Sequence, residues 1–526
     1  MSSTARFTRG LLAASVLSAV ALGAQAQELT IGFADPVSSV DPQLNNHAGD
    51  RSLALHLWDS IINSRDGSVL EPALAKEWKA LDETTWEFKL RDDVKWHDGE
   101  PFTAEDIVFS FERAGNVPGS VASYSGALRT VESVEAPDPH TVIVKTNVPN
   151  PKLPLDIASI YVVSKHVGEN ATTDDYNSGK AAIGTGPYTF VSYTPGDRTI
   201  LKRNPDYYGE PQHWETVNYR FINNASSRTA ALLAGDVDVI DKVAATDLAR
   251  LESNDNIAVH SYPGLRVFLL QPSFAEGTHE FIKDHEGKPM DVNPLRDQKV
   301  REALSIAINR EAIVDRVLQN TVTVANQWMP EGSFGYNPNI EKIKFDPNKA
   351  KELLAEAGYP NGFQLTLHVP GDRYPYASET AQAVAQFWSR IGVRTQVETA
   401  PWSVYGSRAS KNEYAVSVIA WGNGTGEAGY GLLQTLATHD PEKGQGINNW
   451  GRYSNPKVDE ALDASTREFD DAKREEIFQQ AATLVTDDVG HIPLFHYKNI
   501  WASRKDLKVV PILSDRTSAL QVSPVQ

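Results

Sequence analysis

A glycine-rich stretch near the C-terminal end has the spacing of a nucleotide-binding loop. Residues 424–429 (GTGEAG) fit G-x-G-x-x-G, and residues 415–421 (AVSVIAW) before them predict a buried strand. A dinucleotide site also needs an acid at the end of the next strand, about 20 residues on. Position 449 is Asn, and the nearby Asp440 and Glu442 lie in a loop-like stretch. The pattern therefore disfavours a nucleotide loop and leaves the role of the glycines open.

Other motifs of catalytic chemistry are missing from the sequence. Gly179-Lys180 and Gly287-Lys288 are followed by Ala and Pro, so neither is a Walker A loop, and no G-x-S-x-G or H-E-x-x-H occurs. His491 and His496 would face opposite sides of a strand, so packing is a better expectation than joint metal ligation. No cofactor or metal site is expected. Carboxylates brought together only by folding would escape this search, so an exported enzyme remains an alternative.

Composition limits the partners and the compartment. The 526-residue chain carries 68 acidic and 50 basic side chains, for a formal net charge of −18. Nucleic acid and anionic membrane surfaces would be repelled, so neither is expected as a partner. There are no cysteines, so disulfides, thiolate sites and a lipid anchor on an N-terminal cysteine are excluded. The length predicts two or three domains.

The N-terminus has the pattern of a secretory signal peptide. Arg6 and Arg9 precede the apolar residues 11–23, and Ala24-Gln25-Ala26 supplies an A-x-A cleavage site. The apolar run is shorter than the about 20 residues that a membrane-spanning helix needs. We therefore expect residues 1–26 to be removed and the mature protein to be a freely diffusing periplasmic monomer, not inserted in the membrane.

Strands and helices are intermixed along the mature chain. Alternating or continuous apolar runs predict strands at 86–90, 141–145, 393–398 and 492–497. Thr103 with Asp106 predicts the start of a helix through Arg113, and Asp346-Pro347 starts another that Gly358 ends. Further helices are expected at 377–391 and 470–488. No low-complexity linker separates these segments, which favours lobes joined by several chain crossings.

Eight stretches occur in the same order as in one known family. They include WEFKLRDDVKWHDGEPFTAEDIVFSFER (86–113), GTGPYTF (184–190), RNPDYYG (203–209), ALLAGDVDVI (231–240), PLRDQKVREALSIAINREAIVDRVL (294–318), FDPNKAKELLAEAGYPNGF (345–363), SRIGV (389–393) and YSNPKVDEALDAS (453–465). In these stretches the chain resembles the family 5 solute-binding proteins of bacterial ABC importers, the dipeptide/oligopeptide-binding type. The resemblance covers nearly all of the mature chain.

The resemblance implies an α/β clamshell with a hinge between two lobes of mixed sheets, and an extra α+β domain inserted in the first lobe. On the family pattern, lobe I comprises 27–63, 183–266 and 489–526, the inserted domain 64–182, and lobe III 267–488. Solute binds between the lobes, closure encloses it, and the closed form docks on the inner-membrane ABC permease. A small peptide or peptide-like solute is implied.

The resemblance also places the ligand contacts, and here the sequence departs from the family. Peptide binders have an Asp soon after the Trp that corresponds to Trp421, but this chain continues Gly422, Asn423, Gly424 and Thr425, with Glu427 as the first acid. The arginine that dipeptide binders place before the helix at 377–391 is replaced by Ser378 or Glu379. Trp421 itself and the loop residues 422–425 and Glu427 are candidate ligand contacts, and the remaining candidates are Arg373, Tyr374, Trp402, Asn45 and His47.

These departures put an ordinary dipeptide in doubt. Glu427 and Arg373 could replace the missing charges from shifted positions. Alternatively the solute could be a longer or modified peptide, a glutathione-like molecule, an opine or a sugar conjugate. An exported enzyme and a periplasmic peptide-holding chaperone remain the rival interpretations.

Overall fold

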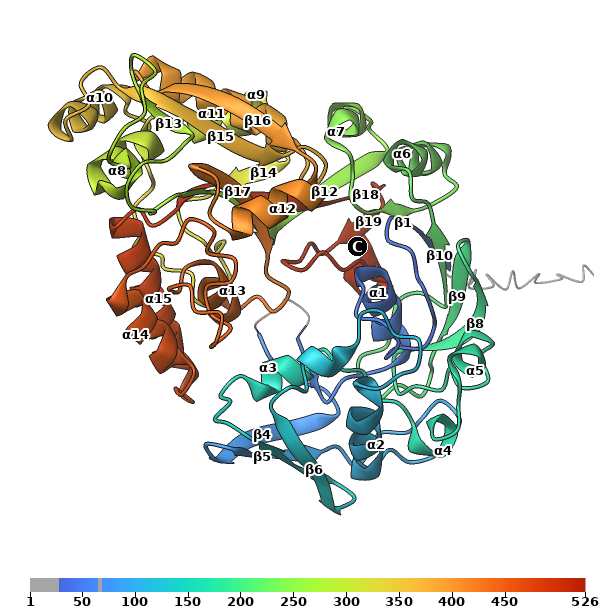
Figure 1. Cartoon of the computed structure of the whole chain (residues 1–526). Coiled ribbons are helices and arrows are strands. Elements are labelled where there is room, and N and C mark those ends of the chain that lie inside the picture. Colours follow the sequence, from blue (N-terminus) through green and yellow to red (C-terminus); the bar gives the residue numbers. More distant parts are fainter. Residues whose placement is uncertain (1–27, 65–68, 526) are drawn as a thin grey trace, which may run out of the picture.

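A computed structural model describes residues 28–64 and 69–525 (Figure 1). Its largest sheet has twelve strands, in the order β13-β15-β17-β12-β18-β11-β1-β10-β9-β8, with β14 on β18 and β16 on β15. The strands are β1 (Glu28–Phe33), β8 (Tyr188–Thr194), β9 (Arg198–Arg203), β10 (Thr216–Phe221), β11 (Val239–Ile240), β12 (Ile257–Pro272), β13 (Ile282–Asp284), β14 (Val322–Val324), β15 (Phe363–Pro370), β16 (Arg394–Ala400), β17 (Val416–Gly422) and β18 (Ile492–Arg504). Parallel and antiparallel pairs coexist, so the sheet is mixed.

Strands β12 and β18 extend through both lobes. The first part of β12, from Ile257 to Pro263, pairs with the end of β18, and that end of β18 also pairs with β11. From Val267 onward β12 pairs with the start of β18 and with β17. The register shifts between Pro263 and Val267, where Gly264 lies so close to Tyr497 O that a β-carbon would approach it to 2.8 Å. This irregular point is the place where the paired strands can bend.

The run Val267–Leu270 shows why these strands are apolar on both faces. Val267 and Leu269 pack into one core, with residues such as Trp328 and Phe478, whereas Phe268 and Leu270 pack into another, with residues such as Trp388. Successive side chains on a strand point to opposite faces, so a central strand covered on both sides reads as a continuous apolar run.

Lobe I and the inserted domain share a separate core, which contains Leu29, Trp58, Phe88 and Trp501. The inserted domain has an antiparallel sheet in the order β4-β5-β7-β6, and Figure 1 shows it at the bottom of the molecule. Its elements are β2 (Ile62–Asn63), β3 (Glu71–Pro72), β4 (Ala75–Asp82), β5 (Thr85–Leu90), α2 (Ala104–Ala114), η1 (Tyr124–Gly126), β6 (Val131–Asp138), β7 (Thr141–Thr146), α3 (Leu153–Ile157), α4 (Lys165–Gly168) and α5 (Thr173–Asn177).

The remaining helices flank the large sheet. In lobe I they are α1 (Ala48–Leu57), α6 (Ala225–Ala234) and α7 (Ala245–Glu252), followed at the C-terminal end by β19 (Leu507–Val509), η3 (Ala519–Gln521) and β20 (Val522–Pro524). In lobe III they are η2 (Pro294–Arg296), α8 (Gln298–Ile306), α9 (Arg310–Arg316), α10 (Pro347–Glu356), α11 (Ala377–Arg390), α12 (Trp402–Ser410), α13 (Ala428–Thr435), α14 (Pro456–Ser465) and α15 (Asp471–Asp487). No helix of the described residues is long and apolar enough to cross a membrane.

The local predictions of helix starts are confirmed. Asp106 Oδ2 accepts the Thr103 amide at 2.9 Å at the start of α2, and Asp346 Oδ1 accepts the Lys349 amide at 2.9 Å at the start of α10. Gly358 follows α10 in the left-handed region, with φ +92°. The strand expected at 492–497 is longer than predicted, because β18 runs on to Arg504. The signal segment 1–26 lies outside the described residues.

The GTGPYTF motif fixes helix α1. Gly186 donates its amide to Leu57 O at 3.0 Å, and a β-carbon on Gly184 would lie 1.7 Å from the same oxygen. Only glycine allows the backbone at 184 to approach the last turn of α1 so closely. The contact holds the helix whose first turn faces the cleft described below.

The lobe boundaries remain a proposal, and the packing of β18 refines the last of them. Ile492, Leu494 and Phe495 pack with Phe268 and Trp388 in a lobe III core, whereas Trp501 packs in the lobe I core. We therefore propose that the last crossing between the lobes lies within β18, near Tyr497, and not at residue 489.

Candidate ligand-binding cleft

A cleft lies between lobe I with the inserted domain on one side and lobe III on the other. It has two parts, which we call the hinge half and the outer half, with volumes of about 750 and 770 Å³. Each is in the range of small-molecule sites. Asn46, Arg51, Gly424 and Arg516 line both halves, so they mark the junction between them.

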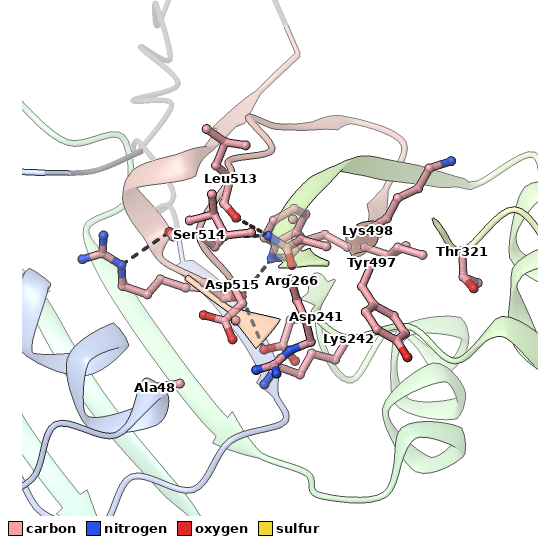
Figure 2. Close-up of a pocket in the computed structure, with 18 of the residues that line it drawn as sticks. Ala48, Asp241, Lys242, Arg266, Thr321, Tyr497, Lys498, Leu513, Ser514 and Asp515 are labelled. Atoms are coloured by element: carbon pink, nitrogen blue, oxygen red, sulfur yellow. Dashed lines mark hydrogen bonds between the residues drawn. The ribbon is translucent and has the colours of Figure 1, made fainter. Parts of the chain in front are cut away.

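Much of the wall of the hinge half comes from four segments of the chain. These are residues 241–245, the bend of β12 at 264–266, residues 497–501 of β18, and the C-terminal segment 513–517 (Figure 2). The Asn499 side-chain amide donates to the carbonyls of Ile512, Leu513 and Ser514, at 3.2, 2.8 and 3.0 Å. One side chain on a hinge strand thus holds the C-terminal segment as a wall of the cleft.

Behind this wall Asp241 belongs to a buried network. Its carboxylate accepts the Ala34 amide at 2.9 Å and the Thr517 hydroxyl at 3.3 Å, and Trp501 Nε1 donates to that hydroxyl at 2.8 Å. Burial raises the pKa of Asp241 to about 6, although Arg228 at 3.7 Å opposes the shift. The carboxylate is committed to holding the C-terminal segment, because its hydrogen bonds go to that segment and to neighbouring backbone.

Arg266 is an exposed cation at the bend of β12. Its Nη1 donates to Ala420 O at 3.1 Å, and its guanidinium lies against Gly422, where a β-carbon would approach Nη2 to 2.7 Å. No carboxylate of the described residues forms an ion pair with it. In Figure 2, Lys498 points away from Arg266, and its Nζ donates to Asn320 O at 2.9 Å.

Two further arginines meet at the junction. Arg51 lies in the first turns of α1, and its buried Nε has no hydrogen-bond partner among residues 28–64 and 69–525. Arg516 follows in the C-terminal segment and donates to Ser64 O at 2.8 Å. Burial lowers the pKa of Arg516, and the charge of Arg51 lowers it further. Tyr161 and Asp515 oppose this shift. Both arginines line both halves of the cleft.

The outer half differs because most of its own cations have carboxylate partners. It lies between residues 126–159 of the inserted domain and residues 424–478 of lobe III. Lys152 pairs with Asp156 at 2.8 Å, Lys443 with Asp440 at 3.7 Å, and Arg474 with Glu427 at 3.6 Å. The ring of Phe469 lies 5.9 Å from that of Trp86, so lobe III touches the inserted domain through this pair.

Part of the loop predicted from the sequence lines the cleft. Gly422 and Asn423 line the hinge half, Gly424 both halves, and Thr425 and Glu427 the outer half. Asn423 shapes the loop, since its side chain accepts the Thr425 amide at 3.2 Å and donates to Glu427 O at 2.6 Å.

Glu427 is a buried partner of Arg474 and not an exposed acid. Its side chain is 4% exposed, and burial raises its pKa while Arg474 opposes the shift. Gly429, the last glycine of the G-x-G-x-x-G match, packs on Phe478, where a β-carbon would lie at 2.8 Å. That glycine serves helix packing.

Six of the predicted site residues do not line either half. Trp421 is half-buried beside Tyr430, with ring centres 6.1 Å apart, and Trp402 belongs to an aromatic cluster with Tyr374, Tyr405 and Trp450. Arg373 lies over the Trp402 ring at 5.1 Å, and Pro375 and Tyr376 line the hinge half instead.

Asn45 and His47 flank Asn46, which lines the cleft, but neither of them lines it. Asn45 is buried and bonds to Ser38 and Val121, and His47 precedes α1 beside Asp50 at 3.7 Å. Asn46 between them lines both halves.

Sequence reasoning missed the three arginines Arg51, Arg266 and Arg516. Arg266 had a usable signal, since it is a lone charge before the buried run 267–270 in GLRVFLL. Arg51 and Arg516 had none, because only tertiary packing brings a first-turn helical residue beside the C-terminal segment.

The histidines noted in the sequence are buried. His491 and His496 are 6% and 4% exposed, and burial lowers the pKa of each to about 4. His496 bonds to Trp328 O at 3.0 Å. Among the described residues, no group of three or more side chains is arranged to hold a metal ion.

Comparison with known proteins identifies the family. Residues 69–442 match the model of the bacterial extracellular solute-binding proteins, family 5 Middle. The chain therefore belongs to the family 5 solute-binding proteins. Its homologues and structural neighbours are substrate-binding proteins of ABC importers, and this chain is one as well.

Individual relatives have different names. The chain is 28% identical to heme-binding protein A of Haemophilus influenzae, over 84% of this chain and 81% of that one. It is 27% identical to the dipeptide-binding protein of Escherichia coli, over 94% of both. The structure of HbpA2 from Haemophilus parasuis matches with a TM-score of 0.84 at 26% identity, covering 95% of this chain and all of that one. These matches confirm the periplasmic-binding-protein clamshell.

Proposed function

We propose that this protein captures a peptide-like solute in the periplasm and delivers it to an inner-membrane ABC permease, without catalysing a reaction. The observation that carries the proposal is the cleft between lobes that β12 and β18 cross together. A solute that contacts both lobes only in the closed form stabilises that form by its additional contacts. The signal pattern at 1–26 supports export of the protein.

We propose that the cleft-lining loop residues Gly422, Asn423, Gly424 and Thr425 approach the solute mainly through backbone. Glu427 is paired with Arg474, so an exposed carboxylate for a peptide ammonium group is missing from this loop. This supports a modified or peptide-like solute instead of an ordinary dipeptide. Glutathione, which names two relatives, is a candidate of that kind, and heme, which names another, is a candidate of a different chemical class.

Native mass spectrometry of the protein purified from its host tests the proposal. We expect a co-purified solute of small-molecule mass that is released on denaturation. Hydrolysis of added peptides, or turnover of added NAD, would overturn the binding-protein proposal in favour of an exported enzyme. A heterogeneous mixture of unrelated peptides would overturn it in favour of a chaperone.

A further inference from the structure

The cleft is cationic in a protein that is strongly acidic. Nine cationic side chains line the two halves, against four carboxylates, whereas the whole chain has a net charge of −18. A positive potential inside the cleft favours an anionic ligand, even though the protein as a whole is negative. The cations cannot be explained by the overall composition, so their clustering points to the solute.

Four cations line the cleft without an ion pair among the described residues, namely Arg51, Arg129, Arg266 and Lys498. Arg129 is exposed in the outer half and Lys498 points away from Arg266, so Arg51 and Arg266 indicate two separate anion positions. Arg51 lies at the junction of the halves beside Arg516, and its Nε has no hydrogen-bond partner among the described residues. Arg266 lies in the hinge half alone, and the hydrogen bond of its guanidinium goes to a neutral carbonyl, Ala420 O. Holding like charges together costs free energy in the empty protein, and a bound anion recovers it.

We propose that the solute carries two anionic groups, carboxylates in a peptide-like molecule, one bound by Arg51 with Arg516 and the other by Arg266. The inference rests on the proposed function and names the solute class for that cleft. Guanidinium groups bind carboxylates through paired, charge-assisted hydrogen bonds, which suits this role better than lysine would. The two positions discriminate against a zwitterionic dipeptide, because such a peptide has a single backbone carboxylate and leaves one of the two positions without an anion.

Calorimetric titration with acids and their esters tests the proposal. The probes are glutathione and heme, each with two carboxylates, and glutathione diethyl ester and heme dimethyl ester, in which those charges are removed. We expect at least one diacid to bind with a dissociation constant below about 1 mM. Its diester is expected to bind at least about tenfold more weakly.

Variants of Arg51 and Arg266 test which anion position each arginine forms. Arg51→Gln and Arg266→Gln are each expected to weaken the diacid about tenfold or more while leaving the diester unchanged. The matched control is Arg250→Gln, which removes the same charge from an exposed position on α7 away from the cleft and should bind as the wild type does. Arg51→Gln should unfold at the same or a higher temperature, because it removes a charge beside Arg516. If Arg51→Gln does not fold, the exposed Arg266→Gln variant still decides the comparison.

The proposal is overturned if neither diacid binds below about 1 mM, if an ester binds as tightly as its acid, or if both arginine variants bind the diacid like the wild type. These failures differ from failure of the proposed function. A neutral or cationic solute co-purified with the protein would refute the two anion positions while leaving the solute-binding function in place.

Discussion

The cations of the cleft differ in whether the protein pairs them, and both kinds occur in each half. Lys242 of the hinge half is paired with Asp35, and Arg129 of the outer half has no ion pair among the described residues. In the outer half, Lys152, Lys443 and Arg474 are each paired with a carboxylate of the protein. At the junction and in the hinge half, Arg51 and Arg266 have no such partner among the described residues. Arg51 is partly buried and Arg266 exposed, so both are free to form charge-assisted hydrogen bonds with an anionic group of the solute.

The walls of the two halves are built from different parts of the fold. The hinge half is built from strands that cross between lobes and from a C-terminal segment fixed by Asn499 and Asp241. The outer half lies where the inserted domain meets lobe III, and these two parts also touch through Phe469 and Trp86. We therefore expect the hinge half to recognise the solute and the outer half to enclose it.

The largest expected effect concerns the support of Arg51. Gly184→Ala places a β-carbon 1.7 Å from Leu57 O, so we expect a loss of about 3 kcal/mol in the free energy of unfolding as α1 is displaced. The matched control is Gly126→Ala in the outer half, where a β-carbon would have no atom within 4 Å. That change should cost less than about 0.5 kcal/mol. Urea denaturation measures both, and equal stability of the two variants would remove the supporting role of Gly184.

Substitution of Trp421 tests whether its ring serves packing or ligand contact. Because its ring packs beside Tyr430 and does not line the cleft, Trp421→Ala should lower the free energy of unfolding by about 2 kcal/mol and change solute affinity less than about threefold. Trp421→Phe should recover most of the stability. A large loss of affinity at unchanged stability would show instead that Trp421 contacts the solute.

Gly422→Ala tests Arg266 without altering any charge. The new β-carbon would lie 2.7 Å from Arg266 Nη2, so the guanidinium must move, and affinity for a dianionic solute should fall about tenfold. Gly371→Ala is the control, because its β-carbon would make ordinary contact at 3.7 Å with Thr399. Calorimetry on both variants sharpens the comparison, and equal affinities would show that the position of Arg266 does not matter.

The smallest effect is expected from a paired charge of the outer half. Lys443 is exposed and lies 3.7 Å from Asp440, so Lys443→Gln should change solute affinity by less than about twofold. The same titration measures it. An effect as large as that of Arg51→Gln would break the distinction between paired and unpaired cations.

Local chemistry made much of the fold predictable. The helix starts at Thr103 and Asp346 depend on residues three positions apart or closer, and the strands depend on apolar runs that tertiary packing does not change. The loop 422–427 was located because its strand and the family pattern agree. In contrast, the side chains of Asn45 and His47 turn away from the cleft that Asn46 lines, and no residue pattern encodes that rotation.

The arginines of the cleft could not be predicted because they come from three distant parts of the chain. Arg51, Arg266 and Arg516 line one cleft only after β18 has crossed between the lobes and Asn499 has fixed the C-terminal segment. Arg51 and Arg516 are ordinary basic residues in their local sequences, whereas Arg266 stands out only as a lone charge before a buried run. Their common feature, a charge without a carboxylate partner for Arg51 and Arg266, exists only in the folded protein.

A crystal structure of the protein with its co-purified solute tests the central claim most directly. The account predicts an anionic group of the solute within about 3.2 Å of a guanidinium nitrogen of Arg51 or Arg516, and a second one at Arg266. A solute whose anionic groups face only solvent or the loop at 424–427, with the three arginines making no contact to it, would contradict the account.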